Sequence, residues 1–274
     1  MAFAVAIFML VTGCAGASGT LSDSNGADPR PARELTVFAA ISLSEAFREI
    51  AVAYESEDSG VSVELNLAGS QRLRTQLEHG APGDVFASAD HRQMELARIG
   101  GLVDGKPAVF ATNRLAVIVP KEDPAGMVTD VYDMGNQGIK IALALPDVPA
   151  GRYAQEMISR LENSEVKSDL HLTSRILANV VTLEPNVRGV AAKVALGEVD
   201  AGVIYVTGVS TDYIRDRVRV IPIPEQSHVV AAYPIAALRE AGDSLLAEDF
   251  IRFVLSPKGQ LILAGHGFGP ASDP

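Results

Sequence analysis

Groups that can donate hydrogen bonds gather at the points where predicted strands pass into predicted helices. Ser42 follows the first strand, Ser70 follows the second, and small residues around Ala150 precede a later helix. The first N–H groups of a helix have no internal acceptor, and the helix end there has a partial positive charge. A cluster of hydroxyl and amide donors at such ends would therefore bind an anion.

Two later positions add donors of the same kind. Asn186 is expected to cap a helix and to leave the Val187 N–H unpaired, and Tyr205 ends a strand. Arg72 and Arg188 are near in the sequence, but the following helical turn is expected to direct both outward. The predicted donors are Ser42, Ser70, Ala150, Val187 and Tyr205. They would hold an anion without a matching cation.

Each of these positions also has a purely structural explanation. Ser42 and Glu45 have the spacing of a capping box, and Ser70 fits a plain N-cap. The residues around Ala150 fit an ordinary loop, and a strand-end tyrosine such as Tyr205 is often half-buried packing. A capping serine can still donate its proton to a ligand, because a hydroxyl has one proton and two lone pairs.

The elements that position these groups alternate between strands and helices. Strands are expected at 35–40, 61–67, 84–87, 114–119, 139–143, 180–183, 201–205, 218–221 and 229–233. Helices are expected at 43–54, 71–79, 91–99, 151–162, 187–196, 245–255 and 258–264. This alternation predicts an α/β fold with a largely parallel sheet, in which ligands bind beyond the carboxyl ends of the strands.

Composition narrows the range of partners. The chain has 274 residues, 47% of them hydrophobic, and a net charge of −11. Such acidity argues against nucleic acid, which requires a basic surface, and against attraction to anionic lipid. One cysteine excludes an internal disulfide, and the five histidines are scattered without the spacing of metal ligands.

The N-terminal segment indicates export. Residues 2–11 contain no charge but are fewer than the roughly 20 residues that span a bilayer, and they match the apolar region of a signal peptide. The run from Val11 to Cys14 resembles a bacterial lipoprotein signal. We predict a signal over 1–14 with Cys14 as lipid anchor, a flexible linker over 15–33, and an extracytoplasmic location. The alternative is a small buried thiol in an N-terminal helix.

Six segments together resemble the molybdate-binding proteins of ABC importers, the ModA-type family. The resemblance extends over residues 34–268. The matching segments are TVFAAISLSEAF (36–47), LAGSQRL (67–73), GAPGDVFASAD (80–90), VPAGRYA (148–154), NVRGVAAKVALGEVDAGVIY (186–205) and SHVVAAYPIA (227–236). Together these segments are specific, whereas any one alone would be weak.

The resemblance implies a type II periplasmic-binding-protein fold. Two α/β lobes, each with a central, mostly parallel sheet flanked by helices, would be joined by two crossover strands. One lobe would comprise residues 34–113 plus 230–274, and the other residues 114–229. Ile41 stands where the family usually has a smaller residue, so it could narrow the pocket or face the core.

The resemblance also implies a function. The family's oxyanion ligands fall, by local match, on Ser42, Ser70, Ala150, Val187 and Tyr205. The implied protein is a monomeric receptor, not an enzyme, and it needs no cofactor. Molybdenum would enter only as its oxyanion, molybdate, with tungstate as a second ligand. An ABC transporter permease would be the protein partner, and the lipid anchor would hold the receptor at the membrane.

Several other functions remain open from the sequence. The same fold could bind tungstate selectively, or sulfate or phosphate. A carboxylate-based tungstate site could use Asp147 and Glu184. A hydrolase would need Ser42 or Ser70 as nucleophile, but neither lies in a G-x-S-x-G motif or has an obvious histidine partner. A regulatory sensor would need a DNA-binding segment, whereas the N-terminal region indicates a signal and a linker.

Overall fold

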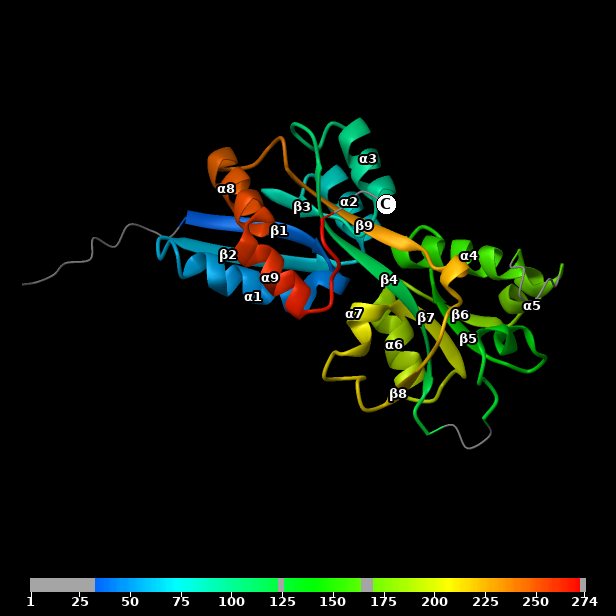
Figure 1. The fold of residues 1–274 in the computed structure, drawn as a ribbon. Helices are drawn as coiled ribbons and strands as arrows, with labels where there is room; N and C mark the ends of the chain where they lie inside the picture. Colours follow the sequence, from blue (N-terminus) through cyan, green and yellow to red (C-terminus); the bar gives the residue numbers. More distant parts are fainter. Residues whose placement is uncertain (1–32, 123–125, 164–169, 272–274) are drawn as a thin grey trace, which may run out of the picture. The chain divides into compact units, whose positions relative to one another are not determined.

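The described part of the chain forms one mixed sheet of nine strands. The computed structural model describes residues 33–122, 126–163 and 170–271, so Cys14 and residues 15–32 of the predicted linker lie outside the described residues. Neighbouring strands follow the order β2-β1-β3-β9-β4-β7-β5-β6, and β8 pairs with β4 (Figure 1). Helices pack against the strands in both halves of this sheet. The fold therefore belongs to the predicted α/β class.

The first group of parallel strands is built around β1. The group comprises β1 (Arg33–Ala40), β2 (Val61–Ala68) and β3 (Val85–Ala87). β1 lies between the other two and pairs parallel with both. The helices of this region are α1 (Ser44–Glu55), α2 (Ser70–Glu78), α3 (His91–Ile99), α8 (Ser244–Leu255) and α9 (Pro257–Gly265). We refer to these elements as region 1.

The second group of parallel strands is built around β5. The group comprises β5 (Ile141–Ala144), β6 (Val180–Glu184) and β7 (Ala201–Tyr205), with β5 between the others. The helices are α4 (Pro149–Glu162), α5 (Leu172–Ala178), α6 (Val187–Ala195) and α7 (Val206–Val209). We refer to these elements, with β8 (Val218–Ile221), as region 2.

Two antiparallel strands connect the regions. They are β4 (Ala108–Pro120) and β9 (Val230–Ala237) (Figure 1). β4 pairs with β9 up to Arg114 and with β7 from Leu115 onward. β9 pairs with β3 at its other edge. The sheet is therefore parallel within each region and antiparallel only where β4 and β9 take part.

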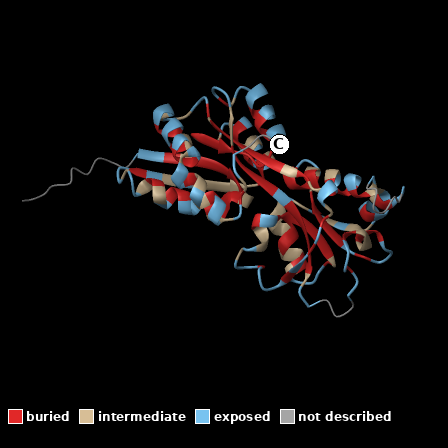
Figure 2. Ribbon diagram, in the orientation of Figure 1, coloured by how far each residue is buried: buried red, intermediate tan, exposed pale blue. Residues whose placement is uncertain are grey.

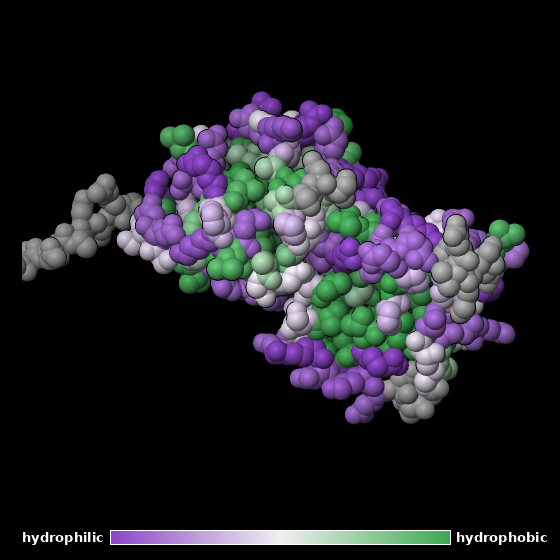
Figure 3. Space-filling model, viewed as in Figure 1, coloured by the Kyte–Doolittle hydropathy of each residue, from purple (hydrophilic) through white to green (hydrophobic). Residues whose placement is uncertain are grey.

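Apolar burial holds both regions together. Figure 2 shows the central strands mostly buried, whereas the outer strands β2 and β6 carry several exposed or partly exposed residues. In region 1, Phe47 packs with its ring centroid 5.6 Å from Phe110 and 6.3 Å from Phe250. Each fully buried phenylalanine contributes about 1.5–3 kcal/mol of hydrophobic stabilisation. Hydrophilic residues cover much of the visible surface in Figure 3, as the net charge leads one to expect.

The structure differs from the predicted elements in a few places. β4 begins at Ala108 instead of 114, and short 3-10 turns occur at Ile41–Leu43, Val131–Gly135 and Glu225–Ser227. The helices α5 and α7 were not predicted. Among the described residues, no helix is both long enough and apolar enough to cross a membrane.

Candidate functional site

The five predicted donor residues line a single cavity between regions 1 and 2. About 220 Å³ of empty space, part of it open to solvent, lies within this cavity. Its lining comprises Ala40, Ile41, Ser42, Gly69, Ser70, Ala89, Val148, Pro149, Ala150, Asn186, Val187 and Tyr205. None of these described lining residues is charged. We call this space the donor cavity.

Ser70 is placed to donate into the donor cavity. It is the first residue of α2, and Gly69 is the N-cap, so the N-cap alternative for Ser70 is wrong. Its Oγ accepts the N–H of Ala89 at 3.0 Å, and the residue is only 1% exposed. Since the Ala89 amide uses a lone pair of the hydroxyl, the Ser70 proton remains available to a ligand.

Ser42 does not form the capping box that its spacing allows. Leu43, not Ser42, occupies the N-cap position of α1 and makes no side-chain cap. The Ser42 Oγ instead lies 3.1 Å from the Tyr233 Oη. The structural alternative for Ser42 is therefore wrong, because its hydroxyl interacts with a strand of the sheet and not with the helix backbone.

Two helix N-termini supply the backbone donors. α4 begins with Pro149, and no side chain caps its end, so the Ala150 N–H has no acceptor within the described part of the chain. At α6, the Asn186 Oδ1 accepts the N–H groups of Arg188 at 2.9 Å and Gly189 at 3.2 Å. The cap therefore leaves the Val187 N–H free, as the sequence predicts.

Gly151 allows α4 to begin close to the end of β5. A Cβ at this position would lie 2.1 Å from the Leu145 carbonyl oxygen and 2.4 Å from that of Ala144. We expect Gly151→Ala to push the first turn of α4, and with it the Ala150 N–H, away from the donor cavity. The variant is expected to bind its ligand at least about 10-fold more weakly and to lose about 1–3 kcal/mol of stability.

The matched control for that variant is Gly265→Ala, because a Cβ at Gly265 would meet no atom within 4 Å. Calorimetric titration and thermal unfolding of both variants measure the two effects. Unchanged affinity and stability in Gly151→Ala would show that the close approach of α4 to β5 is not required.

Tyr205 is a buried donor without a partner. The residue is 2% exposed, and its hydroxyl has no hydrogen-bond partner among the described residues. Burial raises the pKa of Tyr205 well above its ordinary value, so the hydroxyl keeps its proton at any physiological pH. An unpaired buried hydroxyl costs about 1–3 kcal/mol, which a ligand acceptor would offset.

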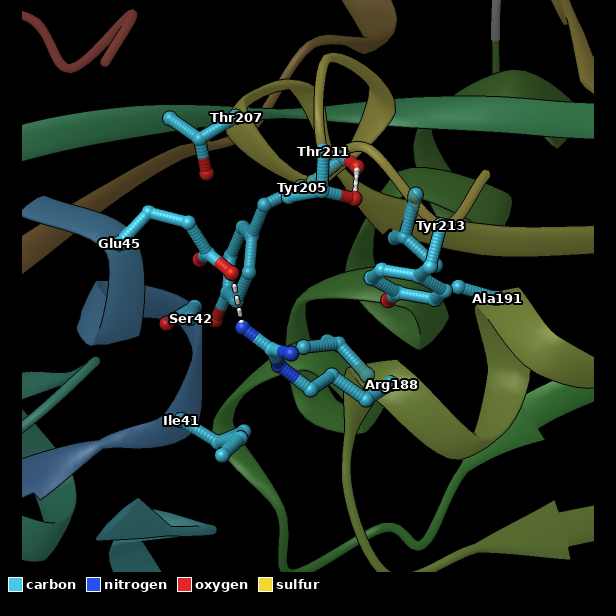
Figure 4. Close-up of a pocket in the computed structure, with 12 residues that line it drawn as sticks. Ile41, Ser42, Glu45, Arg188, Ala191, Tyr205, Thr207, Thr211 and Tyr213 are labelled. Carbon is cyan, nitrogen blue, oxygen red and sulfur yellow. Dashed lines mark hydrogen bonds and ion pairs between the residues drawn. The ribbon is translucent and has the colours of Figure 1, made fainter. Parts of the chain in front are cut away.

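The sequence predicts that the Arg188 side chain points outward, and this prediction is wrong. Its guanidinium forms an ion pair with the Glu45 carboxylate of α1 (Figure 4), and it also contacts the Ser44 Oγ. Burial acts to raise the pKa of Glu45, but the hydrogen bond and charge of Arg188 outweigh it and hold this pKa below its ordinary value. The cation is thus paired with a carboxylate at the edge of the site. Arg72, by contrast, is exposed as predicted.

Further contacts join region 1 to region 2 around the donor cavity. Asp90, 1% exposed, accepts hydrogen bonds from Arg152 at 3.3 Å. Burial raises the pKa of Asp90, while its bonds to the Gln93 N–H and to Arg152 oppose the rise. The Gln93 Nε2 also donates to the Asp147 carbonyl at 2.9 Å. The two regions are therefore held together by polar contacts beside the cavity.

The positions of Ile41, Asp147 and Glu184 relative to the donor cavity decide between alternatives that the sequence left open. Ile41 lines the donor cavity, so it narrows the pocket and does not face the core. Asp147 and Glu184 are not among the lining residues, which removes the support for a carboxylate site. No cluster of three or more metal-ligating side chains occurs in residues 33–122, 126–163 and 170–271.

Sequence reasoning missed Tyr233 and Asn113, which lie on the two connecting strands behind Ser42. The Asn113 Nδ2 lies 2.9 Å from the Thr207 Oγ1 and 3.4 Å from the Tyr233 Oη. Both residues are buried within apolar strands. A polar residue in such a strand was the only available signal, and it does not reveal which distant hydroxyl it meets.

Comparison with known proteins identifies the family to which the chain is similar. The family model described as bacterial extracellular solute-binding protein matches residues 35–269. The molybdate-binding protein ModA of Mycobacterium tuberculosis is 34% identical over 261 residues, covering 95% of this chain and 94% of that protein. YvgL of Bacillus subtilis, provisionally named an ABC transporter substrate-binding lipoprotein, is 26% identical and covers 97% of this chain and 95% of its own length.

A solved structure shows the same fold. The periplasmic molybdate-binding protein of Azotobacter vinelandii superposes with a TM-score of 0.69 over 88% of this chain and 99% of that one, at 19% identity. The type II periplasmic-binding-protein class predicted from the sequence is confirmed.

Proposed function

The chain belongs to the bacterial extracellular solute-binding protein family, with ModA-type proteins among its relatives, and on that premise we propose that it is a molybdate receptor. It would capture molybdate, and also tungstate, in the donor cavity and deliver it to an ABC importer. The observation that supports this most strongly is the convergence of five neutral donors, including the unpaired Tyr205 hydroxyl, on one uncharged cavity.

The donor set favours a fully deprotonated oxyanion. Ser42, Ser70 and Tyr205 have protons to donate, and the Ala150 and Val187 N–H groups can only donate. A protonated oxyanion such as hydrogen phosphate needs an acceptor for its own proton, so it would leave one bond unmade. Charge-assisted bonds to an anion contribute about 1.5–3 kcal/mol each, and several of them reach the roughly −8 kcal/mol of a micromolar ligand.

Thermal unfolding with a panel of oxyanions tests this function. Saturation at about 100 times Kd adds about 2.7 kcal/mol of stability, which corresponds to a rise of about 5 to 11 °C in Tm for a chain of this size. We expect that rise with molybdate and tungstate and none with phosphate. A rise with sulfate and none with molybdate would show that the substrate assignment is wrong.

The two regions would act as lobes that close on the ligand. The predicted lobes meet between residues 113 and 114 and between residues 229 and 230. The pairing of β4 supports the first boundary, because its partner strand changes from β9 to β7 between Arg114 and Leu115. Contacts such as Asp90 to Arg152 would form on closure, and the closed surface would be what the permease recognises. We propose that the receptor acts as a monomer, since the five donors all come from one chain.

We propose that Cys14 anchors the receptor to the membrane from the extracytoplasmic side. The apolar run before Cys14 and the similarity to a relative named as a lipoprotein support this anchor. We expect Cys14→Ala to move the protein from the membrane fraction to the soluble fraction after cell fractionation. A variant that still sediments with membranes would exclude Cys14 as the anchor.

A receptor fits the site better than a hydrolase. The Ser70 Oγ contacts a backbone N–H and the Ser42 Oγ contacts a tyrosine hydroxyl. Neither partner is a general base at neutral pH, which a nucleophilic serine requires. We therefore propose that the protein binds its ligand without chemical change and needs no cofactor.

A further inference from the structure

We propose that Tyr233 and Asn113 are positioning residues that make Ser42 a hydrogen-bond donor toward the bound oxyanion. This inference rests on the proposed function, because it concerns the same donor cavity. It assigns a role to two residues on the connecting strands β4 and β9, neither of which lines that cavity.

The Asn113 side chain fixes the donor and the acceptor in the first of these hydrogen bonds. The Arg114 N–H donates to the Asn113 Oδ1 at 2.9 Å, so the amide oxygen is identified and the Nδ2 must face the other way. That Nδ2 can only donate, and it lies 2.9 Å from the Thr207 Oγ1 and 3.4 Å from the Tyr233 Oη. The Tyr233 hydroxyl therefore accepts a bond from Asn113.

The next hydrogen bond joins the hydroxyl groups of Tyr233 and Ser42. The Tyr233 hydroxyl has one proton, and the Ser42 Oγ lies 3.1 Å from its oxygen. The bond between these two hydroxyls could run either way, and with Asn113 already donating to the Tyr233 Oη we infer that the Tyr233 proton is donated to Ser42. The Ser42 Oγ thus accepts a bond, and its own proton is directed elsewhere, toward the donor cavity that the residue lines.

Ser70 has the same arrangement by a different route. The Ala89 N–H, which can only donate, occupies a lone pair of the Ser70 Oγ at 3.0 Å. Both serines would therefore present protons to the ligand, one directed by a backbone amide and the other by two buried side chains. Tyr233 is 0% exposed and Asn113 is 4% exposed, so both of these side chains are shielded from solvent.

The test is a double-mutant cycle on Ser42 and Tyr233. Tyr233→Phe removes the hydroxyl but keeps the ring. The centroid of this ring lies 5.8 Å from that of Tyr205 and 6.3 Å from that of Phe110, and both pairs pack edge-on. We expect it to raise the Kd for molybdate about 10-fold. In a Ser42→Ala background the same change is expected to alter Kd less than about 2-fold, because Tyr233 acts through Ser42.

The matched control is Tyr54→Phe. Tyr54 is also buried, and its hydroxyl bonds to Asp249 at 3.0 Å, away from the donor cavity. We expect this control to leave Kd unchanged. Thermal unfolding of all variants separates a general loss of stability from a loss of affinity.

Two results would overturn the inference. One is an unchanged Kd in Tyr233→Phe, and the other is an equal loss of affinity with and without Ser42. The titrations are run with molybdate, tungstate and sulfate on the unaltered protein first. If that protein binds sulfate and not molybdate, the proposed function fails, and the cycle is carried out with sulfate to decide the role of Tyr233 separately.

Discussion

Ser70→Asp is expected to abolish molybdate binding. Ser70 is 1% exposed and lines the donor cavity, so a carboxylate there would lie within a few ångströms of a doubly charged anion. Two unit charges at about 4 Å repel by about 4 kcal/mol at an effective dielectric constant of about 20. The loss of affinity is therefore expected to be at least about 1,000-fold by calorimetric titration.

The matched variant is Ser70→Ala, which removes the donor without adding a charge. It is expected to weaken binding by about 10- to 150-fold, the range of one charge-assisted hydrogen bond. Folding should survive the aspartate, because an acidic residue in the first turn of a helix is favourable and can still accept the Ala89 N–H. Molybdate affinity retained in a folded Ser70→Asp protein would place the anion elsewhere.

Val187→Pro is expected to remove one backbone donor while leaving α6 intact. Val187 is the first residue of that helix, where proline is well tolerated. Asn186 before it has φ −165° and ψ 171°, an extended conformation that suits the residue preceding proline. We expect a loss of affinity of about 10- to 150-fold, with thermal stability close to that of the unaltered protein.

Two further variants separate the amide from other effects. Val187→Ala shortens the side chain but keeps the N–H, so it is expected to lose much less affinity than the proline variant. Ser244→Pro places proline at the first residue of α8, which is not part of the donor cavity, and reports the effect of such a change on stability. Equal affinities of Val187→Pro and Val187→Ala would remove this amide from the site.

Most of the fold could be predicted because its elements have clear hydrophobic periods. β7 is a continuous apolar run, β1 is apolar from Val37 to Ala40, and α1 buries Phe47, Ile50 and Tyr54 on one face. α5 was missed because its seven residues bury only Leu172 and Ile176. The start of β4 was missed because Thr112 and Asn113 interrupt its apolar run.

The candidate site could be predicted in residue types but not in detail. Strand-to-helix junctions identify helix N-termini from sequence, and parallel strands bring these ends to one edge of a sheet. Which atoms satisfy each hydroxyl depends on contacts between distant segments. The Ser42 hydroxyl meets a residue 191 positions away. Arg188 turned inward for the same reason, since its partner Glu45 lies in another region of the fold.

A crystal structure of the molybdate complex, phased on the anomalous signal of molybdenum, tests the central claim most directly. The claim predicts one tetrahedral anion in the donor cavity. Its oxygens would lie about 2.7–3.2 Å from the two serine hydroxyls, the Tyr205 hydroxyl, and the N–H groups of Ala150 and Val187. Molybdenum bound instead beside the Arg188 guanidinium, or coordinated by carboxylate oxygens, would contradict the claim.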